Sequence, residues 1–238
     1  MRWLGQRLVA LAIVVISVAL SACGFLTGWT PTPVVSAREV LARSASAMDD
    51  LTSAHFRFIV SNGTMALGPG LEATSFEGDA AAPDRLNVLI RARLSGTPVE
   101  LRLIAIGDRQ YLTNPLSRQW QDVSGSLNTP ALLDSRRGIG LILRSIEEAD
   151  FATPPVPLGG SPFHIRGTIR ANAIASLVGG GDPASGVVSA ELRITQGDYR
   201  LRSARLVGAI SQGEAASLER LLELSEFNRP VTIEPPSI

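Results

Sequence analysis

Residues 85–103 carry the feature that most limits how this chain can fold, an alternation of apolar and polar side chains broken by one turn. In an extended chain successive side chains point to opposite faces, and Ser95-Gly96 is a two-residue turn that reverses the chain. Such a turn pairs Leu94 with Thr97, Ala92 with Val99, Ile90 with Leu101, and Val88 with Leu103. Both strands then present apolar residues on one face. That face must be covered by the protein's own helices, a partner or an apolar ligand.

Composition indicates a folded protein without a nucleic-acid partner. The 238 residues are 45% hydrophobic and 18% charged, which is typical of a globular chain with a sizeable core. The formal net charge is zero, and all 22 basic residues are arginine. These arginines are spread along the chain, so they form no basic cluster that would favour nucleic acid.

The amino terminus has the pattern of a secretion signal. Arg2 and Arg7 precede an apolar run over residues 8–20, and these 13 residues are too few for a bilayer core that needs about 20. The run ends in "LSACG", which resembles the lipobox of bacterial lipoproteins, where the cysteine receives a diacylglycerol and becomes the new amino terminus. The alternative is that Cys23 is a buried thiol in a signal-anchor helix. Cys23 is the only cysteine, so no internal disulfide is available.

These features divide the chain into three parts. Residues 1–22 are interpreted as a lipoprotein signal peptide, and residues 23–35, with Pro31 and Pro33, as a lipidated extended tether. Residues 36–238 contain no second linker and are expected to form one domain. We expect this domain to lie on the extracytoplasmic side of the cell membrane, attached through the lipid on Cys23.

Within the domain, the patterns predict an α+β fold dominated by antiparallel strands. Ser36 with Glu39 is a capping box that starts a helix extending to about Leu51. Thr129-Pro130 has the pattern of a helix cap followed by a first-turn proline, and Ile139, Ile142, Leu143 and Ile146 then recur at helical spacing, which predicts either a helical hairpin or a broken helix. Residues 171–178 are predicted to form a short helix. Alternation predicts strands in the following segments: 52–61, 73–80, 85–94, 97–103, 109–114, 118–123, 161–170, 186–195 and 199–210.

The segment from Glu214 to Glu226 fits either period, and we favour a strand for its second half. In total the chain is expected to have about ten strands and three or so helices, and a sheet of this size curls or closes. Too few helices are present to bury a whole face of such a sheet.

Patterns that indicate catalysis or a metal centre are missing from the sequence. His55 and His164 have no neighbouring Cys or paired carboxylates at ligand spacing, and the chain has no Gly-x-Ser-x-Gly motif. Glu147, Glu148 and Asp150 are interpreted as the solvated acidic end of a helix. We therefore expect no catalytic residue, no metal and no cofactor, and predict that the protein is not an enzyme. Tyr111 and Trp120 are interpreted as packing partners on adjacent strands.

The order of these segments resembles the LppX/LprG (LppX_LprAFG) family of bacterial lipid-binding lipoproteins. The similarity is carried by a series of segments between the lipobox and the carboxyl terminus. These are "SAHFRFIVSNG", "GDRQYLTNPLSRQW", "GIGLILRSIEEADF", "FHIRGTIRANAIASLVGG" and "FNRPVTIEPP", the last resembling the family's closing strand. The resemblance implies a single strongly curved antiparallel sheet, a half-barrel of the LolA/LppX type, with a few helices on its concave face and an apolar cavity that holds acyl chains. The family has no catalytic residues to transfer.

Two interpretations of the apolar face remain open. Periodicity alone favours an ordinary core sealed by the 139–146 helix. The resemblance favours a face shared between the helices and an acylated lipid or glycolipid. The predicted cavity lining is Phe56, Phe58, Leu86, Val88, Ile90, Val99, Leu101, Leu103, Ile139, Ile142, Leu143 and Ile146.

The expected function is that of a monomeric lipoprotein that binds lipid and carries or presents it in the cell envelope, with a membrane transporter as a candidate partner. The alternative is a non-carrier envelope lipoprotein that binds a protein partner or senses envelope state. Cavity volume distinguishes the two, because a carrier needs an open apolar pocket of several hundred Å³ and an interaction module does not.

Overall fold

The computed structural model describes residues 35–126, 131–155, 160–178 and 182–237. Residues Ser36–Ile238 form one compact unit, and the buried apolar side chains of the described residues, from Ala37 to Ile233, all belong to it. The helices of the described part are α2 (Ala37–Asp49), α3 (Ile139–Arg144) and α4 (Ala171–Val178). The strands are β1 (Ser53–Ser61), β2 (Met65–Gly68), β3 (Leu71–Ala81), β4 (Arg85–Leu94), β5 (Thr97–Ile106), β6 (Arg109–Thr113), β7 (Trp120–Asp122), β8 (Glu147–Phe151), β9 (Phe163–Arg170), β10 (Val187–Ile194), β11 (Leu201–Val207) and β12 (Glu219–Ser225).

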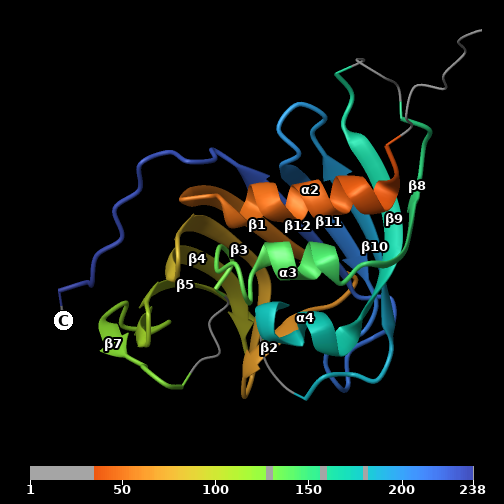
Figure 1. The fold of residues 1–238 in the computed structure, drawn as a ribbon. Coiled ribbons are helices and arrows are strands. Elements are labelled where there is room, and N and C mark those ends of the chain that lie inside the picture. Colours follow the sequence, from red (N-terminus) through yellow and green to blue (C-terminus); the bar gives the residue numbers. More distant parts are fainter. Residues whose placement is uncertain (1–34, 127–130, 156–159, 179–181, 238) are drawn as a thin grey trace, which may run out of the picture. The chain divides into compact units, whose positions relative to one another are not determined.

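All twelve strands belong to one open antiparallel sheet (Figure 1). The order across the sheet is β7-β6-β5-β4-β3-β1-β12-β11-β10-β9-β8, and β2 pairs with β3 outside this path. The first strand of the sheet, β1, and the last, β12, are therefore neighbours at its centre, whereas β7 and β8, which follow each other in sequence, form its two edges. The predicted fold class, a curved antiparallel sheet with few helices, is confirmed, with twelve strands instead of about ten.

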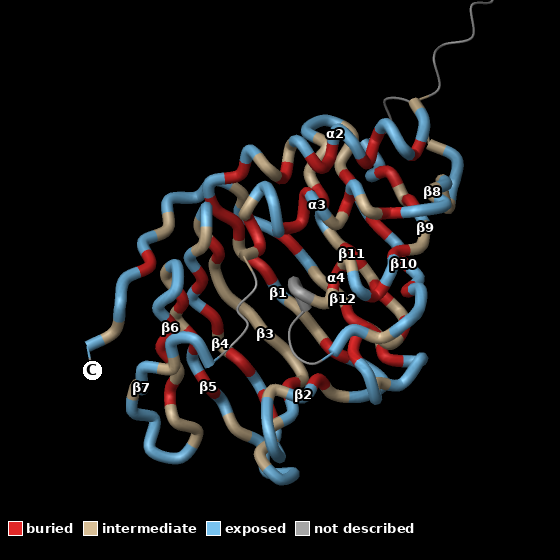
Figure 2. The backbone as a smooth tube through the Cα atoms, turned by 60° about the horizontal axis from the view of Figure 1, so that its bottom comes forward, coloured by how far each residue is buried: buried red, intermediate tan, exposed pale blue. Residues whose placement is uncertain are grey.

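This topology explains why the concave face has a roof. Between the β7 edge and the β8 edge, the described residues 131–146 lie over the concave side of the sheet (Figure 1). Residues 123–126 and 131–146, which we call the crossing segment, include α3. Figure 2 shows the curvature of the sheet and the helices gathered on one side of it.

Helix α2 begins as the sequence predicts. The Ser36 hydroxyl accepts a hydrogen bond from the Glu39 N–H at 3.2 Å. The Glu39 carboxylate instead pairs with Arg43 one turn later, so the second half of the capping box is replaced by an ion pair. The helix buries the face that carries Val40, Leu41 and Met48, and it lies across β1, β12 and β11 at one end of the sheet (Figure 1).

A glycine allows β3 and β4 to curve together. Gly78 pairs with Val88 on β4 and with Phe56 on β1. A Cβ atom at Gly78 would lie 2.0 Å from the Asn87 carbonyl oxygen and 2.9 Å from the Val88 Cα. Both are backbone atoms, so this approach of the two strands requires glycine.

The hairpin register agrees with the prediction. Residues Leu94 and Thr97 pair next to the turn, and Ile90 pairs with Leu101. The bounds of the short helix at 171–178 and the strand in the second half of 214–226 also agree.

Two local predictions were wrong, and one strand was not predicted. Glu147, Glu148 and Asp150 lie in strand β8 and not at a helix end, because β8 pairs with β9 and places Glu147 and Asp150 beside arginines of that strand. Residues 227–237 form no strand; the Arg229 carbonyl accepts a hydrogen bond from the Ser53 hydroxyl at 2.5 Å. Strand β2 was not predicted. The proposed Thr129-Pro130 helix start lies outside the described residues.

Candidate apolar ligand cavity

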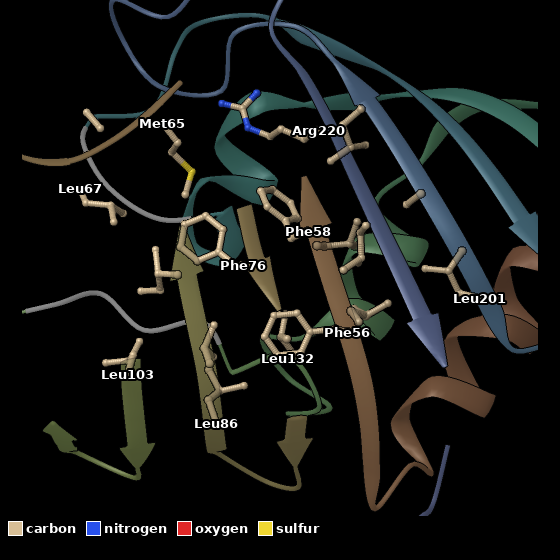
Figure 3. Close-up of a pocket in the computed structure, with 18 of the residues that line it drawn as sticks. Phe56, Phe58, Met65, Leu67, Phe76, Leu86, Leu103, Leu132, Leu201 and Arg220 are labelled. Carbon is tan, nitrogen blue, oxygen red and sulfur yellow. The ribbon is translucent and has the colours of Figure 1, made fainter. Parts of the chain in front are cut away.

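A cavity of about 470 Å³ lies between the concave face of the sheet and the crossing segment (Figure 3). Its sheet wall consists of Phe56, Phe58, Leu71, Phe76, Leu86, Val88, Ile90, Leu101, Leu103, Leu112, Leu192, Leu201, Ala204, Leu206, Arg220 and Leu222. The β2 segment adds Met65, Ala66 and Leu67, and the crossing segment adds Ser126, Leu132, Ile139, Ile142, Leu143 and Ile146. Within the described residues Ser126 and Arg220 are the only lining residues with polar side chains.

Strand alternation builds the sheet wall. On β4 and β5 the inward side chains, such as Ile90 and its partner Leu101, line the cavity. The outward ones include Arg91, which pairs with Glu100 across the same hairpin. Reversing this alternation would place charge in the cavity and leucines in solvent, so the apolar pattern fixes the register.

Helix α3 forms the roof because it packs closely on α2. A Cβ atom at Gly140 would lie 2.0 Å from Asp49 Oδ1 and 3.1 Å from the Ala45 carbonyl oxygen, both on α2. Arg144 of α3 forms an ion pair with the same Asp49 carboxylate. With this face of α3 held against α2, Ile142 and Leu143 point into the cavity.

Aromatic side chains line the centre of the sheet wall. Phe58 of β1 and Phe76 of β3 are directly opposite each other, and their rings meet edge to face with centroids 5.8 Å apart. Figure 3 shows both rings, together with Phe56, projecting into the pocket. This surface is wide and apolar, and it offers no directional polar group to a ligand.

The structure places all of the predicted cavity residues on the cavity wall except Val99. Val99 points to the same face of the sheet as Leu101, but it lies near the turn at the start of β5 and does not reach the cavity. Cys23 lies outside the described residues, so its lipidation remains a prediction. A role for the other predicted residues in holding a ligand also remains a prediction.

Sequence reasoning missed about half of the wall. The missed residues on β10, β11 and β12, such as Leu192, Leu206 and Leu222, follow the same alternation that identified β4 and β5. That signal was present in the sequence. No local signal marks Met65 to Leu67, because β2 is four residues long and its place depends on pairing with β3.

Arg220 is a charged residue in an otherwise apolar part of the wall. Its Nη2 lies 2.5 Å from Oε1 of Glu214, and its Nη1 donates to the Gly208 carbonyl at 3.0 Å. Glu214 also accepts hydrogen bonds from the Ile210 and Ser211 N–H groups at 2.8 and 3.0 Å. Burial raises the pKa of Glu214, but the hydrogen bonds from Ser211, Arg220 and Ile210 outweigh it, and the pKa lies below its usual value. Glu214 is therefore ionised at neutral pH and balances the Arg220 charge.

Neither histidine lies in the cavity wall. His55 pairs through Nδ1 with Asp79 Oδ1 at 2.9 Å on the outward side of the sheet. Within the described ranges no three His, Cys, Asp or Glu side chains are grouped so that they could hold a metal ion. Tyr111 and Trp120 are on adjacent strands but are two positions out of register, with Tyr111 opposite Asp122 and Trp120 opposite Thr113.

Comparison with solved structures identifies proteins with this fold. The crystal structure of LprF from Mycobacterium bovis aligns with 84% of this chain and 97% of its own, at 18% identity and a TM-score of 0.60. The lipoprotein LppX from Mycobacterium tuberculosis aligns with 83% of this chain and 98% of its own, at 25% identity and a TM-score of 0.57. A LolA superfamily protein from Nitrosomonas europaea aligns with 83% of this chain and 96% of its own, at 10% identity, with a TM-score of only 0.30, which is too low to indicate a shared fold.

A search of curated protein sequences found no match. Among the described helices, none combines the length and the apolar character needed to cross a bilayer. The sequence model of LppX_LprAFG lipoproteins matches residues 36–233, which is most of the chain and nearly the whole compact unit. This chain therefore belongs to the LppX_LprAFG lipoprotein family.

Proposed function

We propose that this protein is a membrane-anchored, extracytoplasmic lipoprotein that binds an acylated lipid or glycolipid in its apolar cavity and carries or presents it in the cell envelope. The observation that carries the proposal is the cavity of about 470 Å³ under the crossing segment. Pockets that enclose small ligands range from about 300 to 1,000 Å³. A core packed at the usual density leaves no space of this size.

The chemistry of the wall favours a hydrocarbon ligand. Leucine, isoleucine, valine and phenylalanine make up most of the lining, and the central sheet wall offers only weak directional contacts. A buried methylene group contributes about 0.8 kcal/mol, so even ten methylenes provide roughly 8 kcal/mol before ordering costs. Among the described lining residues no acid and base side chains face each other, so we propose a binding protein and not an enzyme.

The proposed anchor suits a protein that exchanges lipid with a bilayer. If Cys23 is lipidated, the tether of residues 23–35 spans at most about 45 Å when fully extended. The domain would then stay close to the membrane surface, where an acylated lipid is available. A myristoyl-sized chain alone binds membranes weakly, whereas a diacylglyceryl group holds two chains in the bilayer.

The test is to fill the cavity without disturbing the rest of the domain. Ala204 on β11 lies in the cavity wall between Leu192 and Leu222 of the flanking strands. A phenyl ring in the variant Ala204→Phe takes the space of about four methylene groups, which predicts a loss of roughly 200-fold in affinity. The matched control is Ala42→Phe on the exposed face of α2.

The measurement uses the compact unit Ser36–Ile238 and native mass spectrometry with dioleoylglycerol as the lipid. We expect a complex of one lipid per protein for the wild type and for Ala42→Phe, and a much weaker complex for Ala204→Phe. If the wild type binds no lipid, or if both variants bind as the wild type does, the cavity is not the binding site.

A further inference from the structure

Arg220 is the one charged side chain in the described wall of the cavity. It is 1% exposed and lies on β12 opposite Val60 of β1 and Leu206 of β11. On the same face, Phe58 is its diagonal neighbour, because Phe58 pairs with Leu222 two residues away. A guanidinium in such surroundings is costly unless each of its N–H groups finds an acceptor.

The protein satisfies only part of this guanidinium. The two terminal nitrogens face Gly208 and Glu214, and both of these contacts fix the loop that leads into β12. Nη2 forms an ion pair with Glu214 but no hydrogen bond of regular geometry. The third nitrogen, Nε, has neither an ion-pair partner nor a hydrogen-bond partner among the residues that the structure describes, and it is closed to solvent. Loop packing accounts for the terminal nitrogens and leaves the Nε–H group unexplained.

The position of this group matches one end of the cavity. Figure 3 shows the Arg220 side chain at the same end of the pocket as Met65 and Phe58, and away from Leu86 and Leu103. The Nε atom is closed to solvent, so an incoming acceptor must displace a neighbouring side chain to reach it. Met65 has an unbranched thioether side chain, the type that changes rotamer most readily.

The charge balance selects the type of acceptor. Glu214 is already in contact with Arg220 and neutralises it, so a second carboxylate or a phosphate would be a buried anion without a counter-charge of its own. An uncharged oxygen needs only the hydrogen bond. In an O-acylated lipid, the class proposed above as the ligand, the uncharged acceptor at the head of each chain is an ester carbonyl.

We propose that Arg220 is the polar anchor of this cavity and donates its Nε–H to the ester carbonyl oxygen of a bound acylated lipid. This inference rests on the proposed lipid-binding function and adds a chemical class to it: esters bind in preference to ethers and free fatty acids. The apolar wall holds the chain, and Arg220 fixes its position along the cavity. Arg220 has no part in any reaction.

The variant Arg220→Lys tests the Nε–H group alone. Lysine has a methylene group where arginine has Nε, and its ammonium group lies near the position of the guanidinium carbon, within reach of Glu214. The ion pair is thus kept and the unpartnered donor is removed. If this variant unfolds, the double variant Arg220→Met/Glu214→Gln removes both charges together and also lacks the donor.

Binding of three probes is compared in the compact unit Ser36–Ile238: dioleoylglycerol, its dialkyl ether analogue, which has no carbonyl groups, and oleate. Circular dichroism confirms folding, and Leu221→Met, an apolar change on the same strand at a residue outside the cavity wall, is the control. We expect the wild type and the control to prefer the ester to the ether by about tenfold or more, as a hydrogen bond to a charged donor predicts. Arg220→Lys should bind the ester and the ether with affinities that differ by no more than about twofold, and its affinity for the ether should equal that of the wild type.

Three results would overturn the inference while leaving lipid binding intact. The first is equal binding of the ester and the ether by the wild type, as expected if only a buried water accepts the hydrogen bond from Nε. The second is an ester preference that persists in Arg220→Lys and in the double variant. The third is a preference of the wild type for oleate over the ester. Binding of no probe by the wild type would instead contradict the proposed function.

Discussion

Replacing Gly78 by alanine tests whether the curvature of the sheet depends on this residue. The added Cβ would lie 2.0 Å from the Asn87 carbonyl oxygen and 2.9 Å from the Val88 Cα. Carbon and oxygen atoms in contact without a bond lie more than about 3 Å apart, so β3 and β4 must separate by roughly 1 Å or more. Neither contact atom belongs to a flexible side chain, so the strain cannot be relieved by a rotamer change.

Overpacking of this kind costs about 1–3 kcal/mol, and we expect Gly78→Ala at the upper end because the backbone itself must move. A loss of about 3 kcal/mol lowers Tm by roughly 6–12 °C for a domain of this size. The matched control is Gly186→Ala, whose Cβ would meet nothing within 4 Å. This variant should have a free energy of unfolding within about 0.5 kcal/mol of the wild-type value.

Thermal and urea unfolding of the two variants, followed by circular dichroism, provides the measurement. Phe56 and Val88 are the neighbours of Gly78 on the cavity side, so Gly78→Ala should also weaken lipid binding. If Gly78→Ala and Gly186→Ala unfolded at the same temperature, the close approach of β3 and β4 would not be a requirement of the fold, and our explanation of the curvature would be wrong.

Three further predictions concern the roof, the buried ion pair and the anchor. Leu143 on α3 is 1% exposed, and Leu143→Ala should lower the free energy of unfolding in urea by about 2–3 kcal/mol. Leu141 on the same helix is 40% exposed, and Leu141→Ala should lower it by less than about 0.5 kcal/mol. Similar losses for the two variants would contradict the assignment of α3 as a packed cover of the cavity. The pKa of Glu214 is lowered on folding, so its contribution to stability is present above its ordinary pKa of 4.5 and is lost as the pH falls through the folded-state value. Urea unfolding should therefore show a large gap between wild type and Glu214→Gln at pH 7 that narrows at pH 4, and a gap unchanged by acid would refute the assignment. Cys23→Ser should remove the mass of the diacylglyceryl group from the protein, and cell fractionation should then find the protein either in the soluble fraction or as an unprocessed precursor. Retention of the diacylglyceryl mass would contradict the lipobox interpretation.

The sequence predicts those parts of the fold that depend on local alternation and turn chemistry. The hairpin of β4 and β5 has both a period-two pattern and a two-residue turn at Ser95-Gly96, so its register follows from the sequence alone. Helix α4 has apolar helical spacing and a following glycine run in the sequence, and its predicted bounds agree with the structure.

Parts that depend on distant pairing were not predicted. Glu147 and Asp150 of β8 have the composition of a solvated helix end, but cross-strand ion pairs of 3.0 Å to Arg170 and 3.5 Å to Arg166 accompany them in the strand. Those partners are about twenty residues away, so no local window contains the signal. The same applies to the pairing of β1 with β12 at the centre of the sheet.

The candidate site was predicted in part for the same reasons. Wall residues such as Ile90 and Leu103 follow from alternation, because the inward positions in the middle of β4 and β5 line the cavity. Arg220 was not singled out, since an arginine within a leucine-rich strand has the pattern of an outward-facing residue. Its inward position follows from the pairing of β12 with β1, which places it opposite Val60.

The most direct test of the account is to ask whether the cavity holds lipid when the protein is made in a bacterial cell. The compact unit Ser36–Ile238 would be purified without detergent and extracted with organic solvent, and the extract would be quantified by mass spectrometry against protein concentration. We predict close to one acylated lipid per protein molecule for the wild type, and clearly less for Ala204→Phe. A well-folded wild-type protein whose extract contains no acylated lipid would contradict the central claim that this cavity is a hydrocarbon-binding site.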